Sequence, residues 1–425
     1  MLARSAIGLG FSLRNFRPHA VLCGHRVDTY EGEAAMIRRA AGRRLAAIAL
    51  GGVALVLSAC AAPFESAGTT ARIEFVSTST SGGWKFDYYR NLGYPCSIAG
   101  YQAFVVGTKV GSSATATRPL WVRMRGGGVG YFSADGQPQP SAGNKSQETA
   151  ATLIGFVQPS ALTGRVRSDP AGFRLVSVSM CNHDLYAGGD QPDPNNPNRQ
   201  PDGKPRTTNG LFATKAAIQF VRSQYPTGKT FLHGTSAGSA GAYGVAWSLE
   251  KQGLPPAGVV ADSGIVNLEA SQAKAESGIC IEGGRDPEAV EAIKARSHPT
   301  LATIDNEPDK VVARGGLTVP LMHVWNQGDD NSCGDAQLSC PLRDGTSQML
   351  GATDCTNEPM RAAIAAQGAG SRSRSLRLCV SPADEPGSCS VHVVTNKEFV
   401  NTDPGAPADY NAAIIDWVHS RLGDP

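Results

Sequence analysis

The chain has 425 residues, of which 41% are hydrophobic, so it can bury a substantial core in one large domain or two ordinary ones. Its 39 basic and 37 acidic residues give a net charge of +2, and this near-balance excludes the electrostatic footprint of a nucleic-acid-binding protein. Ten cysteines are more than a reduced cytosolic enzyme usually carries, which points to an exported protein.

The N-terminal part of the chain has the features of an export signal. Residues 36–44 include four arginines, and the apolar run Leu45–Leu57 that follows is shorter than the ~20 residues that span a bilayer. The next residues, Leu57–Cys60, look like a bacterial lipobox, whose cysteine is lipidated after cleavage. An ordinary signal peptidase would also accept Ser58–Ala62. We therefore expect an exported protein, either secreted or attached to a membrane only through a lipid anchor on Cys60.

This signal divides the chain into four parts. Residues 1–35 lie upstream of it and are interpreted as an extension that arises from a start codon assigned too early. Residues 36–60 are the predicted signal peptide and residues 61–70 a linker. A single catalytic domain is expected over residues 71–425.

The cysteines of the mature chain predict a disulfide framework. Removal of Cys23 and Cys60 leaves eight, and an even number in an exported chain favours up to four disulfides. Short intervening loops favour the pairs Cys333–Cys340 and Cys379–Cys389. The remaining connectivity cannot be derived from spacing.

Short apolar runs alternate with helical stretches from residue 71 onward. This alternation predicts an α/β fold with a mostly parallel sheet covered by helices on both faces, in which ligands bind at the carboxyl ends of the strands. The segment 190–203 is rich in proline and asparagine and is expected to be an exposed loop. The predicted strands are 71–76, 101–106, 119–124, 173–180, 231–234, 257–261, 319–325 and 375–380, and the predicted helices are 209–222 with Asn209 as N-cap, the stretch after Ser236, 286–296 and 410–422.

A GTSAG pentapeptide at Gly234–Gly238 lies between a predicted strand and a predicted helix. This is the context of a nucleophile elbow, in which a strained turn lifts the serine clear of the sheet and small neighbours avoid collisions. The turn also aims the backbone N–H of the next residue, Ala237, at the negative charge that develops during acyl transfer. Ser236 is therefore the candidate nucleophile, and it needs a base and an acid.

The chain order serine, acid, histidine of α/β-hydrolases selects His392 as the base. Of the eight histidines, four precede Ser236. His298 lies where a helix runs into a loop, His323 is inside a predicted strand, and His419 is on the last helix. His392 lies between the last strand and the last helix, where the base of such a triad is expected.

The acid is expected at the end of the preceding strand. Asp329 follows the strand at 319–325 in a turn and is our first choice, with its neighbour Asp330 as an alternative. Asp262, one strand earlier, is the runner-up. Its other interpretation is a structural aspartate that bonds turn amides.

Two further groups of residues are assigned to the surroundings of the serine. The glycine-rich run Gly126–Gly130 follows a predicted strand and suits a second oxyanion donor, because glycine lets the backbone approach the substrate closely. His183, Asp184 and Asp190 fit no standard set of metal ligands and are expected to line the mouth of the pocket.

Four short segments occur in the order of a known family. They are CSIAGY at Cys96–Tyr101, GGGVG at Gly126–Gly130, CNHDLYAGGD at Cys181–Asp190 and GTSAG at Gly234–Gly238. In this combination the chain resembles the pectinacetylesterase/Notum family of carboxylesterases, over about residues 90–422.

The resemblance implies an α/β-hydrolase fold that removes O-acyl groups. The residues that it assigns are the triad Ser236, Asp329 and His392, the oxyanion donors Gly128, Val129 and Ala237, and a disulfide between Cys96 and Cys181. The chain departs from the family at Val129 and Gly130, where tryptophan and a nearby cysteine are usual, and at Ser239, where glycine is usual. These departures leave the shape of the pocket, and hence the substrate, open.

Together these features predict an exported serine carboxylesterase at the periplasmic face or cell surface. The expected substrate is an acetylated carbohydrate, the expected intermediate is an acyl-enzyme, and no cofactor is required. One alternative is a serine peptidase or a polyester depolymerase that uses the same residues. Another is a non-catalytic surface lipoprotein built on a hydrolase fold.

Overall fold

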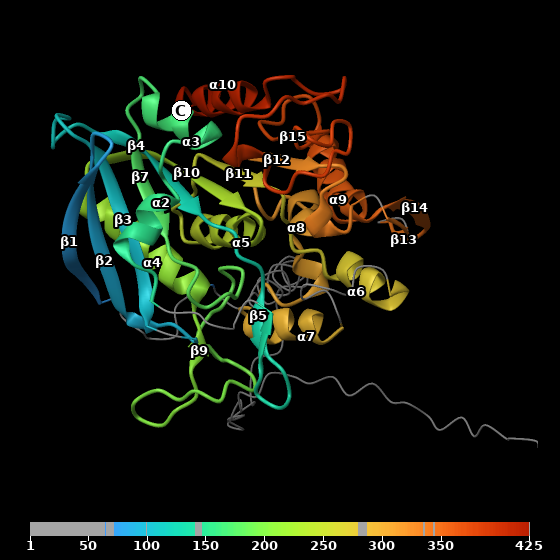
Figure 1. Ribbon diagram of the computed structural model, residues 1–425, viewed down its shortest axis with the longest axis horizontal. Helices are drawn as coiled ribbons and strands as arrows, with labels where there is room; N and C mark the ends of the chain where they lie inside the picture. The colour runs from blue at the N-terminus through green and yellow to red at the C-terminus, as the bar shows by residue number, and fades with distance from the viewer. Residues whose placement is uncertain are drawn as a thin grey trace, which may run out of the picture. The chain divides into compact units, whose positions relative to one another are not determined.

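The structure is a computed structural model, and it describes residues 64, 72–98, 100–140, 147–278, 287–334, 336–342 and 345–424 (Figure 1). The predicted signal peptide, its Cys60 and the segment 1–35 lie outside the described residues. Within these ranges, no helix combines the length and the apolar character needed to cross a membrane.

Within the described residues, nine strands form a central sheet in the order β1-β2-β3-β7-β4-β10-β11-β12-β15. The first four strands in this order pair antiparallel, and every pair from β7 to β15 is parallel. The predicted α/β fold with a mostly parallel sheet is confirmed. In chain order the strands are β1 (Ile73–Ser81), β2 (Trp84–Pro95), β3 (Tyr101–Lys109), β4 (Arg118–Met124), β7 (Arg174–Val178), β10 (Thr227–Thr235), β11 (Gly258–Asp262), β12 (Leu321–Asn326) and β15 (Arg374–Leu378).

Helices cover both faces of this sheet (Figure 1). One hydrophobic cluster joins the sheet to α4, α5, α8 and α9, and a second joins it to α2, α3 and α10. The central strand β10 contributes Leu232 to the first cluster and Phe231 to the second, so it is buried on both faces of the sheet. The helices are α2 (Ala150–Gly155), α3 (Ala161–Ser168), α4 (Gly210–Gln224), α5 (Ala237–Lys251), α6 (Leu268–Ser277), α7 (Pro287–Arg296), α8 (Pro308–Ala313), α9 (Ala352–Ala366) and α10 (Tyr410–Leu422).

Strand β2 was not among the predicted elements. Its aromatic residues Trp84, Phe86 and Tyr88 alternate with the polar Lys85 and Asp87 and are buried in the second cluster. This period of two is the signal of a half-buried strand, which a search for unbroken apolar runs overlooks. In the part of the chain that the structure describes, three small two-stranded sheets lie outside the main sheet, namely β5 (Gly130–Phe132) with β6 (Pro138–Pro140), β8 (Gln191–Pro192) with β9 (Thr207–Thr208), and β13 (Gln337–Pro341) with β14 (Ser347–Gly351).

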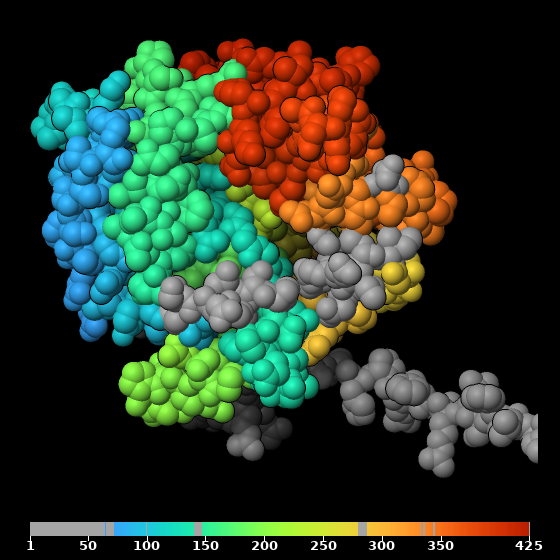
Figure 2. Space-filling view, in the orientation of Figure 1, coloured from blue at the N-terminus to red at the C-terminus, as the bar shows by residue number. Residues whose placement is uncertain are grey.

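The C-terminal region packs beside α3. Figure 2 shows the surface of the C-terminal segment, in red, meeting the green surface of the region that includes α3. Arg165 of α3 forms ion pairs with Glu398 at 3.0 Å and with Asp409 at 2.9 Å, and Asp409 also caps α10 by accepting from the backbone N–H of Ala412. These contacts fix the end of the chain against the second hydrophobic cluster.

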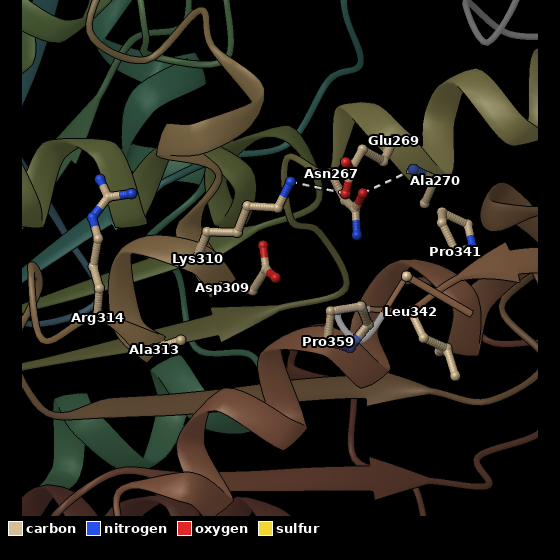
Figure 3. A pocket seen from close by; sticks show the side chains of 11 residues that line it. Asn267, Glu269, Ala270, Asp309, Lys310, Ala313, Arg314, Pro341, Leu342 and Pro359 are labelled. Atoms are coloured by element: carbon tan, nitrogen blue, oxygen red, sulfur yellow. Dashed lines mark hydrogen bonds and ion pairs between the residues drawn. The ribbon is translucent and has the colours of Figure 1, made fainter. Parts of the chain in front are cut away.

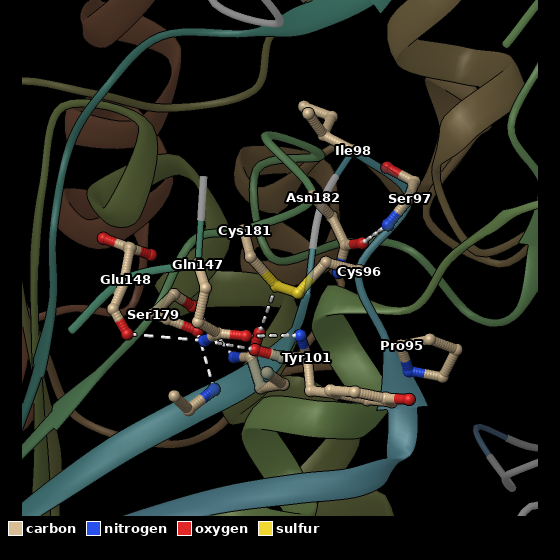
Figure 4. The surroundings of a disulfide bond; sticks show 12 residues. Pro95, Cys96, Ser97, Ile98, Tyr101, Gln147, Glu148, Ser179, Cys181 and Asn182 are labelled. Atoms are coloured by element: carbon tan, nitrogen blue, oxygen red, sulfur yellow. Dashed lines mark hydrogen bonds between the residues drawn. A yellow bond between two sulfur atoms is a disulfide. The ribbon is translucent and has the colours of Figure 1, made fainter. Parts of the chain in front are cut away.

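Three described disulfides differ in part from the expected pairs. Cys379–Cys389 and Cys96–Cys181 are present, and the second joins the entry to β3 with the segment after β7 (Figure 4). The expected pair Cys333–Cys340 is wrong, because Cys340 bonds Cys355 on α9. Strand β13 carries Cys340 into the hairpin with β14, and the chain then returns directly into α9, which brings Cys355 within 5.6 Å of it between Cα atoms. Cys333 is itself disulfide-bonded.

The proline-rich segment 190–203 is not exposed throughout, in contrast to the prediction. Asp193 and Asn196 are buried, at 4% and 6% exposure. Asp193 forms an ion pair with Arg296 at 2.7 Å, and Asn196 donates to the backbone carbonyl of Ser97 at 2.7 Å. Polar composition predicted a solvated loop, but here the polar groups are satisfied by partners far away in the chain.

Candidate active site

The turn at Ser236 has the backbone of a nucleophile elbow. Strand β10 ends at Thr235, α5 begins at Ala237, and Ser236 between them has φ 51° and ψ −124°. Its N–H donates to the backbone carbonyl of Asp262 on the adjacent strand, at 2.8 Å. Ser236 is partly exposed, whereas the residues on both sides of it are buried. The chain accepts this strained backbone only because the strand and the helix hold it from both sides.

The two glycines of the pentapeptide are required by space. A Cβ on Gly234 would lie 2.2 Å from the carbonyl oxygen of Gly238, and a Cβ on Gly238 would lie 2.1 Å from the carbonyl oxygen of Met124 on β4. Both contacts are with backbone, which cannot move aside as a flexible side chain can. The G-x-S-x-G spacing therefore follows from the close approach of β4, β10 and α5 at this turn.

Asp329 and His392 come together at the same edge of the sheet. Asp329 follows β12 and is 1% exposed, and His392 lies in the loop between β15 and α10. His392 Nδ1 is 2.7 Å from Asp329 Oδ2, and the other carboxylate oxygen accepts from the N–H of Asn331 at 2.9 Å. Burial raises the pKa of Asp329, and the hydrogen bond from His392 partly offsets that rise.

The two alternative acids have other roles. Asp330 is exposed, and its backbone N–H donates to the carbonyl of Ser390 at 3.2 Å. The carboxylate of Asp262 is fully buried and accepts hydrogen bonds from Ser263 and Thr395. Only Asp329 contacts His392, so geometry favours it, and its catalytic role stays a prediction.

The third contact of a triad is not made in this structure. Among the described residues, Ser236 Oγ and His392 have no hydrogen bond between them, and the His392 ring is bonded only through Nδ1. Hydrogen bonds of this kind are often long or misaligned without substrate and shorten when it binds. The structure thus brings acid and base into contact and leaves the serine free at the same edge of the sheet.

Two other histidines near this edge are unsuited to act as bases. His323 on β12 is fully buried, its Nδ1 is 2.7 Å from the hydroxyl of Tyr243, and burial lowers its pKa to about 3. His233 on β10 is 1% exposed, and burial moves its pKa well below the usual value. Both rings remain neutral in the core, in agreement with their assignment to the strands.

The glycine loop after β4 lies against the serine. A Cβ on Gly126 would be 2.7 Å from Ser236 Cβ and 3.3 Å from its Oγ. Gly127 and Gly128 have φ of 147° and 71°, which side chains with a Cβ rarely adopt. The loop is therefore in close contact with Ser236 through Gly126. The roles of the N–H groups of Gly128, Val129 and Ala237 stay predictions.

Buried polar groups brace this glycine loop. Arg125 donates to the carbonyl of Gly126 at 2.6 Å and to Glu148 Oε1 at 2.6 Å, and Glu148 Oε2 accepts from the N–H of Met180 at 2.8 Å. Glu148 is drawn near the Cys96–Cys181 disulfide in Figure 4. Arg125 and Glu148 were not among the predicted site residues, because only the fold brings Glu148 next to the end of β4.

His183 and Asp184 are buried beside the glycine loop and the start of α4, in contrast to the expectation that they line the mouth of the pocket. His183 is 1% exposed, its carbonyl accepts from the N–H of Gly130 at 3.0 Å, and its Nδ1 is 3.2 Å from the carbonyl of Gly127. Asp184 is 4% exposed and accepts from the N–H of Gly210 at 2.8 Å, so it caps α4. Burial raises the pKa of Asp184.

The first N–H group of α4 is therefore bonded to Asp184 and not to the predicted N-cap residue, Asn209. Asn209 stands at the N-cap position, but its side chain bonds Asn182 and the carbonyl of Pro95.

Asp190, the third residue expected at the mouth of the pocket, is only partly exposed. Within the described residues, no group of three or more histidine, cysteine or acidic side chains has an arrangement that could hold a metal ion.

A surface hollow of about 560 Å³ lies away from these residues, among α6, α8 and the β13–β14 hairpin (Figure 3). Its charged lining includes Glu269 and Lys310, which neutralise each other in an ion pair of 2.8 Å. Neither Ser236 nor its candidate partners line it. This hollow therefore does not coincide with the candidate catalytic residues.

Similarity to known proteins is found among solved structures. No family model matches the chain, and no curated protein matches it in sequence. Carboxyl esterase 2 of the fungus Tuber melanosporum has 14% identity and a TM-score of 0.45, with 87% of this chain and 97% of that chain covered. An esterase of Rhizomucor miehei has 13% identity and a TM-score of 0.41, with 90% and 92% covered. A glucuronoyl esterase of Solibacter usitatus has 10% identity and a TM-score of 0.44, with 84% and 88% covered.

The fold itself rests on features of this chain. The parallel strands β7 to β15, the elbow between β10 and α5, and the loops after β12 and β15 occur in the order of an α/β-hydrolase. Helices lie on both faces of the sheet, and the candidate catalytic residues lie at the carboxyl ends of its strands, where ligands bind in open α/β sheets. The chain has the α/β-hydrolase fold.

Proposed function

We propose that this protein is a serine carboxylesterase with Ser236 as nucleophile, His392 as base and Asp329 as orienting acid. The observation that carries the proposal is the 2.7 Å contact between His392 Nδ1 and the buried carboxylate of Asp329. This contact keeps the Nδ1 proton in place and leaves Nε2 as the basic nitrogen. It occurs at the edge of the sheet where the elbow presents Ser236.

The reaction would run in two halves. His392 Nε2 takes the proton of Ser236 as Oγ attacks the ester carbonyl, and Asp329 stabilises the imidazolium that forms. The N–H groups of Ala237 and of the glycine loop would bind the oxyanion of the tetrahedral intermediate. Collapse of this intermediate transfers the proton from His392 to the leaving alkoxide and leaves an acyl group on Ser236. Water then attacks the acyl-enzyme with His392 again as base, which releases the acid.

The substrate that we propose is an O-acetylated carbohydrate. Its support is the resemblance to the pectinacetylesterase/Notum family in the segments around Cys96, Gly126, Cys181 and Ser236. Export, and an anchor on Cys60 if the lipobox is used, belong to the same proposal. Release of acetate from a panel of acetylated polysaccharides tests the substrate, and hydrolysis of peptide amides or of polyesters instead would favour the alternative chemistries.

The nucleophile is tested by Ser236→Ala. The variant should lower kcat on p-nitrophenyl acetate by roughly 10⁶-fold if the three residues act as a unit, and it should no longer react with a fluorophosphonate probe. A matched control is Ser248→Ala on the same helix, because among the described contacts the buried hydroxyl of Ser248 has no hydrogen-bond partner. Near-full esterase activity in Ser236→Ala would refute the proposal. Folded wild-type protein that neither hydrolyses esters nor reacts with the probe would point to a non-catalytic protein.

A further inference from the structure

The loop that carries His392 is held on its N-terminal side by Asn326, the last residue of β12. The Asn326 side-chain amide donates to the carbonyls of Val380 and Val391, at 2.7 and 3.0 Å, and its oxygen accepts from the N–H of Val380 at 2.8 Å. Asn326 is fully buried. A single amide therefore joins the start of the loop, at Val380, to the residue directly before His392.

The same loop is held on its C-terminal side by Asp262, the last residue of β11. The Asp262 carboxylate accepts from the N–H groups of Val394 and Thr395, at 3.3 and 2.9 Å, and from the Thr395 hydroxyl at 2.6 Å. It also accepts from the hydroxyl of Ser263 at 2.7 Å, and that hydroxyl accepts from the N–H of Val393 at 3.2 Å. Three successive residues after His392 are thus bonded to one carboxylate or to its neighbour.

Asp262 also joins this loop to the nucleophile. Its backbone carbonyl accepts from the N–H of Ser236 at 2.8 Å, while its carboxylate holds the residues after His392. A Cβ on Gly264, two residues further on, would lie 2.2 Å from the carbonyl oxygen of Ser236, so this turn is in close contact with the elbow. The spacing between nucleophile and base is therefore set through a single residue.

The loop needs such restraint because its backbone is strained. Val393, directly after His392, has φ 61°, and a β-branched side chain is rarely found in this region. A conformation of this kind persists only where surrounding contacts determine it. The buried guanidinium of Arg123 donates to the side chain of Asn396, the residue after Thr395, at 2.9 Å. Burial lowers the pKa of Arg123, and the charge of Asp262 partly offsets that change.

We propose that Asp262 and Asn326 are positioning residues that hold His392 at the distance from Ser236 that proton transfer requires. Neither contacts the His392 ring, so they act through the backbone of residues 391–395 and are not catalytic themselves. This inference rests on the proposed function. Removal of either should slow the chemical step and leave the binding of ester unchanged, because the elbow and the glycine loop stay in place.

The test compares Asn326→Leu and Asp262→Asn with a matched control, Asn401→Leu. Asn401 is also a buried amide with four hydrogen bonds to backbone, from Cys379 and Asp403 and to Asp403 and Ala406, but it bonds no residue of 391–395. For p-nitrophenyl acetate we expect the two test variants to lose about 10²-fold in kcat with KM within about threefold of wild type. The control should lose thermal stability to a similar degree and keep kcat within about threefold.

Two measurements separate this inference from the proposed function. The inference is wrong if Asn326→Leu and Asp262→Asn keep the kcat of the Asn401→Leu control while wild type remains an active, probe-reactive esterase. It is also wrong for Asp262 if Asp262→Asn loses about 10⁴-fold in kcat and Asp329→Asn stays near wild type, because Asp262 would then be the acid. Inactive wild-type protein would refute the proposed function itself.

If Asp262→Asn does not fold, a milder variant can test the role of Asp262. Thr395→Val removes the hydroxyl contact to Asp262 together with the 3.1 Å contact to His233 Nε2, and it leaves both backbone N–H groups bonded to Asp262 in place. We expect a loss of about three- to tenfold in kcat, and a slower reaction of Ser236 with the fluorophosphonate probe by the same factor. Unchanged rates in both assays would overturn the role of Asp262.

Discussion

Asp329 and Asp330 are adjacent in the sequence and opposite in environment. The first is 1% exposed and bonded to His392, and the second is exposed to solvent. Asp329→Asn keeps the size of the side chain but removes its negative charge, and the new amide group can donate to Nδ1 and so favour the wrong imidazole tautomer. If Asp329 has the proposed role, we expect kcat on p-nitrophenyl acetate to fall by about 10⁴-fold with little change in KM, as in Ser-His-Asp triads.

Asp330→Asn is the matched control for this change. This substitution should leave kcat within about twofold of wild type, because the hydrogen bond to Ser390 uses only the backbone N–H of residue 330. Equal losses in the two variants would show that the turn as a whole, and no single carboxylate, supports activity. A loss confined to Asp330→Asn would reassign the acid.

Gly126 is the glycine whose hydrogen faces Ser236. A methyl group there would lie 2.7 Å from Ser236 Cβ and 3.0 Å from the carbonyl oxygen of Thr235. Since neither neighbour can move without disturbing the elbow, Gly126→Ala should lower kcat by about 10²-fold or more. The control Gly155→Ala, at the end of α2, meets nothing within 4 Å and should be neutral in steady-state kinetics. Unchanged kcat in Gly126→Ala would mean that the loop moves freely and does not shape the site.

At the scale of elements, Glu307 holds the start of α6. Its Oε1 accepts from the N–H groups of Leu268 and Glu269, at 2.5 and 3.2 Å, while burial raises its pKa from 4.5 to about 7. The proton is therefore bound more tightly in the folded state than in the unfolded state. The stability that this contributes is present below pH 4.5 and is lost as the pH rises to about 7, by roughly 3 kcal/mol in total.

Glu307→Gln should remove this part of the pH dependence. The amide oxygen can still accept from the two N–H groups, but the side chain no longer titrates. The difference in unfolding free energy between pH 5 and pH 8, measured with urea, should shrink relative to wild type. Glu288→Gln, at an exposed position of α7, is the control and should change nothing. An unaltered difference in Glu307→Gln would show that Glu307 titrates normally in the folded chain.

At the scale of the whole molecule, Arg296 at the end of α7 joins several distant segments. Its side chain is 2% exposed and forms an ion pair with Asp193 at 2.7 Å, where the carboxylate is fully buried. It also donates to the carbonyls of Asn182 and His183, at 2.6 and 3.3 Å. Through His183 this network reaches the glycine loop, so a residue far from Ser236 in sequence supports the shape of the site.

Arg296→Met should destabilise the protein by about 3–5 kcal/mol, because it leaves the buried carboxylate of Asp193 without a positive charge, bonded to the side-chain amide of Asn196. The double variant Arg296→Met with Asp193→Leu should recover part of this loss. The exposed pair Lys204 and Asp202 is the control, and Lys204→Met should cost less than about 1 kcal/mol. Urea unfolding measures all three. A small effect of Arg296→Met would mean that solvent reaches Asp193.

Much of the architecture could be predicted because its signals are local. The apolar run ending at Gly234, the following small-residue helix and the glycine run after β4 all lie within short windows, and the structure has a strand, an elbow and a loop at these places. Strand β2 was missed for a local reason as well, because alternating aromatic and polar residues are harder to notice than an unbroken apolar run.

The sequence by itself determined the order of elements and the residues available for chemistry, since periodicity, glycine spacing and chain order are properties of neighbouring residues. Only the tertiary structure decided which aspartate meets His392, which cysteine meets Cys340, and that Asp184 caps α4. It also decided that Asp262 holds the loop of His392. Each of these contacts joins segments far apart in the chain, and they form only when packing of the sheet brings the ends of its strands to one edge.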